Sequence, residues 1–329
     1  FGLHSAMSVK EARKLCPKGI YLECDKEKYS KVAYEIQNLI YKMSDKVEFV
    51  ALDEGYVDIT KLYEKYKDLE YIAKKFKERI FDKVRLTCSV GIGYNKLSAK
   101  ISSEINKPNG FYIMKDEKQF CEYLSEKSIR VIPGIGGKTQ NILNKFGIYK
   151  VSDISKRSLL ELQGILGHAR GIQLYENAQG IDSRPIENER QHKSIGNETT
   201  LNTPVKDEDF IKENLKKIFD GVFLRLKQKD FYAKTSTIKI RYGDRETIQK
   251  SKSLKTYSKN YLDFLMIFNE LLEEIDLSKP ILLYGFTFSN LEKNISEQLS
   301  LNDLEKIKKN SKLVELQEKI RKKEKGERG

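Results

Sequence analysis

Residues 47–60, VEFVALDEGYVDIT, constrain the fold more than any other stretch, because two runs of strand-forming residues flank an acidic centre. Such flanks favour a half-buried sheet, and Gly55 suits a turn that needs positive φ, so we expect a β-hairpin. Asp53 and Glu54 lie at its tip, where a bend in the backbone is needed for both carboxylates to reach one point. Two converging carboxylates are suited to Mg²⁺, and an ordinary solvated turn is the alternative.

The composition favours a nucleic-acid partner. With 329 residues, 39% of them hydrophobic, the chain has material for about two to four compact units. Lys and Arg number 61 against 48 Asp and Glu, and this net charge of +13 favours a polyanionic partner. No apolar run reaches the length of about 18 residues that a membrane span needs, so we expect no membrane partner. A generally lysine-rich proteome is the alternative explanation of the charge.

The cysteines and histidines argue against a zinc site. The four cysteines include no C-x-x-C pair, and the three histidines are far apart in the sequence. Reduced cysteines and the lack of a signal peptide fit a cytoplasmic protein.

Hydrophobic periodicity around the hairpin indicates an α+β unit. Helices are expected at residues 8–16, capped by Ser8 with Glu11 in a capping box, and at 26–44 and 69–81. Alternation predicts a strand at residues 85–91. Helices that alternate with antiparallel strands predict a sheet with helices on one face, of the ferredoxin-like or palm type.

Residues 91–110, GIGYNKLSAKISSEINKPNG, predict a helix capped by Asn95. By the 3.6-residue period its lysines share one narrow face, and they suit a phosphate-bearing ligand. A solvated lysine face is the alternative. The expected buried stripe is Leu97, Ile101 and Ile105, and the expected polar face is Lys96, Lys100, Ser103 and Lys107.

Residues 132–148, IPGIGGKTQNILNKFGI, form a helix-hairpin-helix pattern. Gly134 and Gly136 belong to a tight turn whose N–H groups suit a DNA phosphate, and Lys138 adds charge. A simple corner between two helices is the alternative. A second glycine-rich corner follows at residues 164–171.

From residue 192 the pattern becomes β-α-β-β-α-β. Alternation places Ile238 and Ile240 toward the helices and leaves Lys239 and Arg241 on the open face of the sheet. With further basic residues nearby, that face is a candidate surface for the DNA backbone, and edge-strand protection by lysines is the alternative. The nearby basic residues are Lys234, Arg245, Lys250 and Lys252.

Four motifs, ALDEGYVDIT, GIGYNKLSAKISSEINKPNG, VIPGIGGKT and NAQGIDSRPI, resemble the signatures of Y-family translesion DNA polymerases of the DNA polymerase IV type. The resemblance is collinear from Phe1 to about Asn290. It implies a multidomain α+β right-hand polymerase with small fingers, a ferredoxin-like palm, a helix-hairpin-helix thumb and a βαββαβ little finger. The expected parts are a fingers remnant at 1–25, palm at 26–114, thumb at 115–182, linker at 183–191, little finger at 192–290 and charged tail at 291–329.

The resemblance implies template-directed nucleotidyl transfer by two Mg²⁺ ions on primed DNA, with deoxynucleoside triphosphates as substrates. The metal-binding acidic pair of the family maps to Asp53 and Glu54. Lys107 matches the lysine that contacts the incoming triphosphate, whereas Asp58 matches a residue that is not a ligand. The family typically works as a monomer.

The sequence also departs from the family pattern. Ala51 replaces a usual serine, and Gly55 replaces a small residue with a Cβ. Another metal-binding aspartate, the steric gate and a Tyr/Arg pair that grips the triphosphate precede the family segment that Phe1 matches. We therefore expect this chain to lack a palm strand beside the hairpin, to bind primed DNA and to polymerise poorly or not at all.

Near the C-terminus, QLSLND resembles the peptide that docks bacterial replication proteins on the sliding clamp. Gln298, Leu299 and Leu301 are its expected clamp-binding residues, and Asn302 stands where the usual aromatic residue would be. Residues 306–329 are highly charged and favour a helix or a disordered tail.

Two other functions remain open from the sequence. One is a non-catalytic protein that binds DNA and the sliding clamp on a retained polymerase scaffold. The other is a palm-type nucleotide cyclase, which needs hairpin carboxylates but has no use for a helix-hairpin-helix thumb. Salt-dependent binding to primed template would exclude the cyclase, because release of counterions weakens DNA binding as salt rises.

Overall fold

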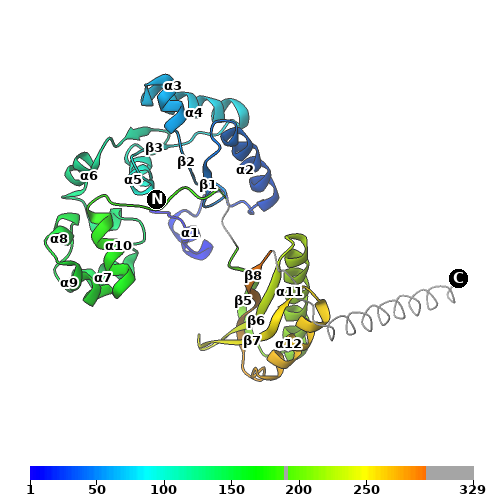
Figure 1. Ribbon diagram of the computed structural model, residues 1–329. Coiled ribbons are helices and arrows are strands. Elements are labelled where there is room, and N and C mark those ends of the chain that lie inside the picture. The colour runs from blue at the N-terminus through cyan, green and yellow to red at the C-terminus, as the bar shows by residue number, and fades with distance from the viewer. Residues whose placement is uncertain (189–191, 294–329) are drawn as a thin grey trace. The chain divides into compact units, whose positions relative to one another are not determined.

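The computed structural model describes residues 1–188 and 192–293. The chain divides into two compact units, Phe1–Arg190 and Gln191–Gly329 (Figure 1). Both units combine helices with strands, which confirms the expected α+β class. No helix in the described part of the chain has the length and apolar character needed to cross a membrane.

The first part of unit 1 contains the acidic hairpin, a second pair of strands and five helices. Ser8 caps the first helix by accepting a hydrogen bond from the Glu11 N–H at 3.2 Å. The hairpin and the expected helices are confirmed, with ends that differ by a few residues. The elements are α1 (Val9–Leu15), α2 (Lys26–Tyr41), β1 (Val47–Phe49), β2 (Gly55–Val57), α3 (Thr60–Tyr66), α4 (Leu69–Val84), β3 (Val90–Ile92), α5 (Lys96–Ile105) and β4 (Phe111–Ile113).

The strand expected at residues 85–91 is wrong for most of its length, since β3 starts only at Val90. Arg85 instead ends α4 in the left-handed conformation, with its N–H bonded to the Phe81 carbonyl. The expectation of antiparallel strands holds for β1 and β2 but not for β3 and β4, which pair in parallel. A helix, α5, connects β3 to β4, and a crossover of this kind brings two strands side by side in the same direction. In the described residues the two pairs form separate sheets.

The helices after β4 share a hydrophobic core with α5. Leu97 and Ile101 of α5 are almost fully buried together with Phe120 and Leu143. This common core packs the helices that follow β4 against α5, the helix that carries Lys96 and Lys100. Its elements are α6 (Glu117–Leu124), the 3-10 turn η1 (Ile129–Val131), α7 (Gly137–Asn144), α8 (Val151–Ser155), α9 (Leu159–Leu166) and α10 (His168–Ala178).

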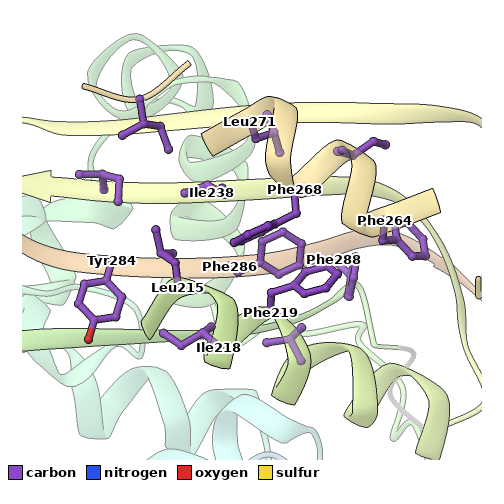
Figure 2. Packing of buried hydrophobic residues seen from close by; sticks show 14 of the residues in the cluster. Leu215, Ile218, Phe219, Ile238, Phe264, Phe268, Leu271, Tyr284, Phe286 and Phe288 are labelled. Atoms are coloured by element: carbon purple, nitrogen blue, oxygen red, sulfur yellow. The ribbon is translucent and has the colours of Figure 1, made fainter. Parts of the chain in front are cut away.

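Unit 2 is a four-stranded antiparallel sheet with the order β5-β8-β6-β7, and it confirms the predicted β-α-β-β-α-β sequence of elements. Aromatic side chains fill the space between sheet and helices, among them Phe219, Phe268, Phe286 and Phe288 (Figure 2). The elements are β5 (Ser194–Val205), α11 (Glu208–Gln228), β6 (Tyr232–Tyr242), β7 (Thr247–Ser258), α12 (Tyr261–Glu273) and β8 (Ile281–Glu292).

The sheet register decides which basic residues reach the open face. Ile238 and Ile240 are fully buried on the helix side, as expected. Lys250 lies opposite Ile238 in the register, and Lys252 is two residues further along the same strand. Both lysines therefore belong to the helix side of the sheet, and the inclusion of Lys250 and Lys252 near the open face was wrong. There they form ion pairs with α12, Lys250 with Glu274 and Lys252 with Glu270.

Candidate active site on the acidic hairpin

The tip of the hairpin presents two exposed carboxylates. The tip closes where the N–H groups of Val50 and Ala51 donate to the Glu54 carbonyl, at 3.0 and 3.2 Å. Asp53 and Glu54 both lie at the surface of this tip. Gly55 does not have positive φ, so that part of the expectation was wrong. A Cβ at Gly55 would instead meet a ring carbon of Phe49 at 2.9 Å, so the close approach of this ring requires the glycine.

Lys100 of α5 and Lys107, two residues past the end of this helix, are called here the lysine row, and a chain of ion pairs joins them to the hairpin. Asn95 caps the helix through a capping box with Ser98, as predicted for its start. Lys100 Nζ lies 2.9 Å from Glu54 Oε1 and 3.2 Å from Glu104 Oε1. Lys107 Nζ is 2.7 Å from the same Glu104 oxygen. The hairpin carboxylate and the expected triphosphate lysine are thus joined by alternating charges.

These contacts shift the pKa values of Lys100 and Glu104 in the directions that favour their charged forms. Burial alone would lower the pKa of Lys100, but its hydrogen bonds with Glu54 and Glu104 raise that pKa above its ordinary value. Burial opposes ionisation of Glu104, yet the bonds from Lys107 and Lys100 lower its pKa. Both shifts favour the charged forms of Lys100 and Glu104, so this ion pair keeps its charges at neutral pH.

A buried ion pair lies under the exposed tip, and sequence reasoning missed half of it. Lys96 Nζ is 2.6 Å from Glu48 Oε2, and their side chains are 10% and 2% exposed. Lys96 was expected only as a member of the lysine face. The sequence gave little indication that Glu48 is buried. A glutamate between two hydrophobic residues of a strand, here Val47 and Phe49, is expected to face solvent.

The donors at the tip fit a magnesium ion that also binds substrate. Mg²⁺ is usually held by one or two carboxylates together with phosphate and water oxygens. Asp53 and Glu54 supply such a pair at an exposed position. Among the described residues no cluster of three or more Asp, Glu, His or Cys side chains could hold a metal. A second ion would therefore need further ligands.

The helix-hairpin-helix turn leaves its backbone open. Gly134 has φ +91°, and a Cβ at Gly134, Gly136 or Gly137 would meet nothing within 4 Å. Gly136 is the N-cap of α7 and makes no side-chain capping bond, and Lys138 follows in the first turn. Gly134, Gly136 and Gly137 are all exposed, so the backbone of this turn is open to solvent.

The open face of the second unit's sheet carries small hydroxyl side chains around the two predicted basic residues. Lys239 Nζ lies 2.7 Å from Glu198 Oε2, and Arg241 Nε donates to Thr247 Oγ1 at 2.9 Å. Along the same face, Thr237 and Ser251 bond to each other at 2.8 Å. Lys239, one of the two expected cations of this face, therefore already has a carboxylate partner.

Comparison with known proteins decides the family. Residues 1–104 match the impB/mucB/samB family, residues 192–301 match the C-terminal domain of that family, and residues 130–182 match the thumb domain of DNA polymerase iota. The chain is similar to DNA polymerase IV of Fusobacterium nucleatum, with 42% identity over 92% of this chain and 86% of the relative. The chain belongs to the Y family of DNA polymerases. It is similar also to DNA polymerase IV of Clostridium perfringens, at 37% identity over 92% of this chain and 85% of the relative.

Solved structures of Y-family polymerases resemble the fold. A Y-family DNA polymerase chimera built on Dbh has a TM-score of 0.79 at 30% identity, over 89% of this chain and 85% of the other. An insertion ternary complex of Dbh DNA polymerase has a TM-score of 0.62 at 29% identity, over 89% and 85% of the two chains. The right-hand fold with a helix-hairpin-helix thumb is thereby confirmed.

These relatives establish the activity of this Y-family chain as a lesion-bypass, DNA-directed DNA polymerase. They do not favour the alternative of a non-catalytic protein that binds DNA and the clamp. The expected clamp-binding residues Gln298, Leu299 and Leu301, and the charged tail, lie outside the described residues.

Proposed function

We propose that Asp53 and Glu54 bind the catalytic Mg²⁺ and that Lys107 contacts the triphosphate of the incoming deoxynucleotide. The observation that carries this proposal is the ion-paired chain from Glu54 through Lys100 and Glu104 to Lys107. Carboxylates at one end and an ammonium group at the other match a metal-bound triphosphate, whose charge is spread over several oxygens.

The residues of the chain have separable tasks in nucleotidyl transfer. Asp53 and Glu54 provide carboxylate oxygens as metal ligands at the exposed tip, where a primer end and a triphosphate have access. A Mg²⁺ ion held by these two carboxylates would neutralise charge on the phosphates and would lower the pKa of the attacking hydroxyl. Lys107, freed from Glu104 when the triphosphate binds, stabilises negative charge on the phosphate oxygens. A two-ion site requires a further carboxylate beyond this pair.

The same proposal includes primed template DNA and deoxynucleoside triphosphates as partners. Support comes from the similar Dbh polymerase, which was solved as an insertion ternary complex. Gly134, Gly136 and Lys138 would meet the DNA backbone at the open turn, and Lys239 and Arg241 would do so on the sheet face. Such contacts position the duplex and carry no base sequence.

We also propose a monomer that works in the cytoplasm and docks on the sliding clamp through Gln298, Leu299 and Leu301. The resemblance of QLSLND to clamp-docking peptides supports the last point. Pull-down of the full chain by a purified clamp, compared with the variant Gln298→Ala, tests it.

Primer extension with Mg²⁺ and all four deoxynucleotides tests the catalytic assignment. We expect Asp53→Ala to reduce extension by more than about a hundredfold, because loss of even an outer partner of a metal ligand costs about 10–100-fold. Lys107→Ala should raise the KM for deoxynucleotide with less effect on DNA affinity. Asp82→Ala removes an exposed carboxylate of α4 and is the matched control.

A binding measurement provides a second test of the assignment that does not require catalysis. In calorimetry, Mg²⁺ and a deoxynucleoside triphosphate are titrated together into each protein. We expect them to bind to the parent chain and to Asp82→Ala, and to bind much more weakly to Asp53→Ala. Extension and binding by Asp53→Ala at the level of the parent would overturn the assignment.

A further inference from the structure

The segment that follows α10 is hydrogen-bonded at one end to the start of α5 and at the other end to the acidic hairpin. We call residues 180–188 the strap. At its start, the Gly180 carbonyl accepts hydrogen bonds from Tyr94 Oη at 3.1 Å and Asn95 Nδ2 at 2.7 Å. Six of the nine residues expected to form the linker, 183–188, belong to the strap. The other three, 189–191, lie outside the described residues.

The end of the strap is joined to strand β1. Asn188 Oδ1 accepts from the N–H of Val47 at 3.1 Å, and Asn188 Nδ2 donates to the Asp45 carbonyl at 2.7 Å. Val47 is fully buried, and a buried N–H needs a partner to avoid a large desolvation penalty. The side chain of Asn188 thus completes the hydrogen bonding of the strand that leads into the acidic tip.

The buried ion pair lies between strap, hairpin and helix. Glu48 Oε2 accepts from the N–H of Glu187 at 3.0 Å while it contacts Lys96. Lys96 Nζ also donates to the Pro185 carbonyl at 3.1 Å and lies 5.1 Å from the centre of the Tyr56 ring. The pair therefore contacts β1, β2, the first turn of α5 and the strap at once.

The two lysines that α5 directs at the hairpin differ in environment. Lys96 is 10% exposed against a carboxylate that is 2% exposed, whereas Lys100 is 28% exposed against Glu54 at 46%. Water and ligands can replace the contact of Lys100 with Glu54 at small cost. The contact of Lys96 with Glu48 cannot be released without leaving a charge buried, so it persists when ligand binds at the tip.

We propose that Glu48 and Lys96 are positioning residues that hold the hairpin, α5 and the strap as one rigid body. They keep the carboxylates of the tip and the lysine row at a fixed spacing, and they fix the end of the strap on the strand that carries the tip. This role rests on the proposed metal and triphosphate site, because it is the geometry of that site that the pair maintains. Neither residue touches the reacting atoms.

Hydrogen exchange of the full chain, followed by mass spectrometry, tests the proposal without requiring activity. In Glu48→Gln and in Lys96→Met we expect exchange of hairpin amides 47–57 and strap amides 183–188 to rise by about tenfold or more, while helices α9 and α10 keep their protection. The double variant Glu48→Gln/Lys96→Met removes both charges of the Lys96–Glu48 pair together and should recover part of the protection. Glu126→Gln, which breaks the exposed pair with Lys150, is the control and should change none of these regions.

Primer extension by the same variants measures the effect of the pair on catalysis. We expect kcat to fall in each single variant and to recover in part in the double variant, with little change in the KM for deoxynucleotide, because Lys107 is untouched. The proposal is overturned if hairpin and strap exchange as in the parent, or if α9 and α10 lose protection equally, since the pair would then serve only general stability. Failure of the metal assignment shows separately, as undiminished extension by Asp53→Ala.

Discussion

Lys100 Nζ lies 2.9 Å from Glu54 Oε1 at the open tip of the hairpin, so a lysine ammonium group occupies part of the space around a proposed metal ligand. The pair is half exposed, and an exposed pair of this kind contributes less than about 1 kcal/mol. Lys100 is thus a weakly held counter-ion of Glu54, and in the proposed site a metal ion would compete with it for that carboxylate.

Replacement of this lysine should tighten the binding of Mg²⁺. Lys100→Met removes a positive charge beside Glu54, and we expect the Mg²⁺ concentration at half-saturation to fall by up to about fivefold. Titration calorimetry with a deoxynucleoside triphosphate measures this midpoint. Lys74→Met breaks a comparable exposed pair with Glu70 on α4 and should leave the midpoint unchanged. A midpoint that rises in Lys100→Met would show that the lysine assists the metal instead of competing with it.

Glu198 should weaken DNA binding by the sheet of the second unit. Its carboxylate holds Lys239 at 2.7 Å, so a DNA phosphate must compete for that ammonium group. We expect Glu198→Gln to increase affinity for primed DNA, and Lys239→Met to lower both the affinity and, by about one, the slope of log K against log salt. Fluorescence anisotropy over a salt series measures both quantities.

Lys250→Met is the matched control on the same sheet. Its ammonium group faces α12, 3.8 Å from Glu274, and is directed away from the proposed DNA surface. The salt slope should therefore equal that of the parent chain. An equal loss of slope in Lys250→Met and Lys239→Met would contradict the assignment of the open face.

The stability contributed by Asp153 should depend on pH. Hydrogen bonds from the N–H groups of Lys150 and Tyr149, followed by one from Lys156, lower the pKa of Asp153 to about 2 from its ordinary value of 3.8. A lowered folded-state pKa adds stability above the unfolded pKa, and that stability is lost as pH falls toward 2. We expect Asp153→Ala to be less stable than the parent at pH 7, with a difference that shrinks progressively as pH falls through the range from about 4 to 2. Urea denaturation across pH measures it, with Glu64→Ala, an exposed α3 residue, as control.

Phe219 should be among the most sensitive core positions of unit 2. Its ring is fully buried, and its centre lies 4.9 and 5.1 Å from those of Phe268 and Phe286 (Figure 2). Phe219→Ala removes a large buried side chain and should destabilise the unit by about 3–5 kcal/mol. Denaturation followed by circular dichroism measures this loss. Phe210→Ala, at a side chain 39% exposed, should change stability far less.

Patterns local in the sequence predicted much of this protein. Strand formers around an acidic pair gave the hairpin, the Asn95 cap and apolar spacing gave α5, and alternation gave the inward-facing Ile238 and Ile240. Each depends on backbone conformation over a few residues, which capping residues and side-chain periodicity indicate directly in the sequence. The motifs led to the correct family for the same reason, since they lie in short contiguous stretches.

Tertiary structure decided the contacts between distant segments. Glu48 meets Lys96 across 48 positions and the Glu187 N–H across 139, and no local pattern reports such pairs. The crossover through α5 made β3 and β4 parallel, and the register of β7 turned Lys250 toward α12. The need for glycine at position 55 arose from the ring of Phe49 rather than from φ. Sequence thus determined which elements form, whereas packing between elements determined which charges are buried and where they are held.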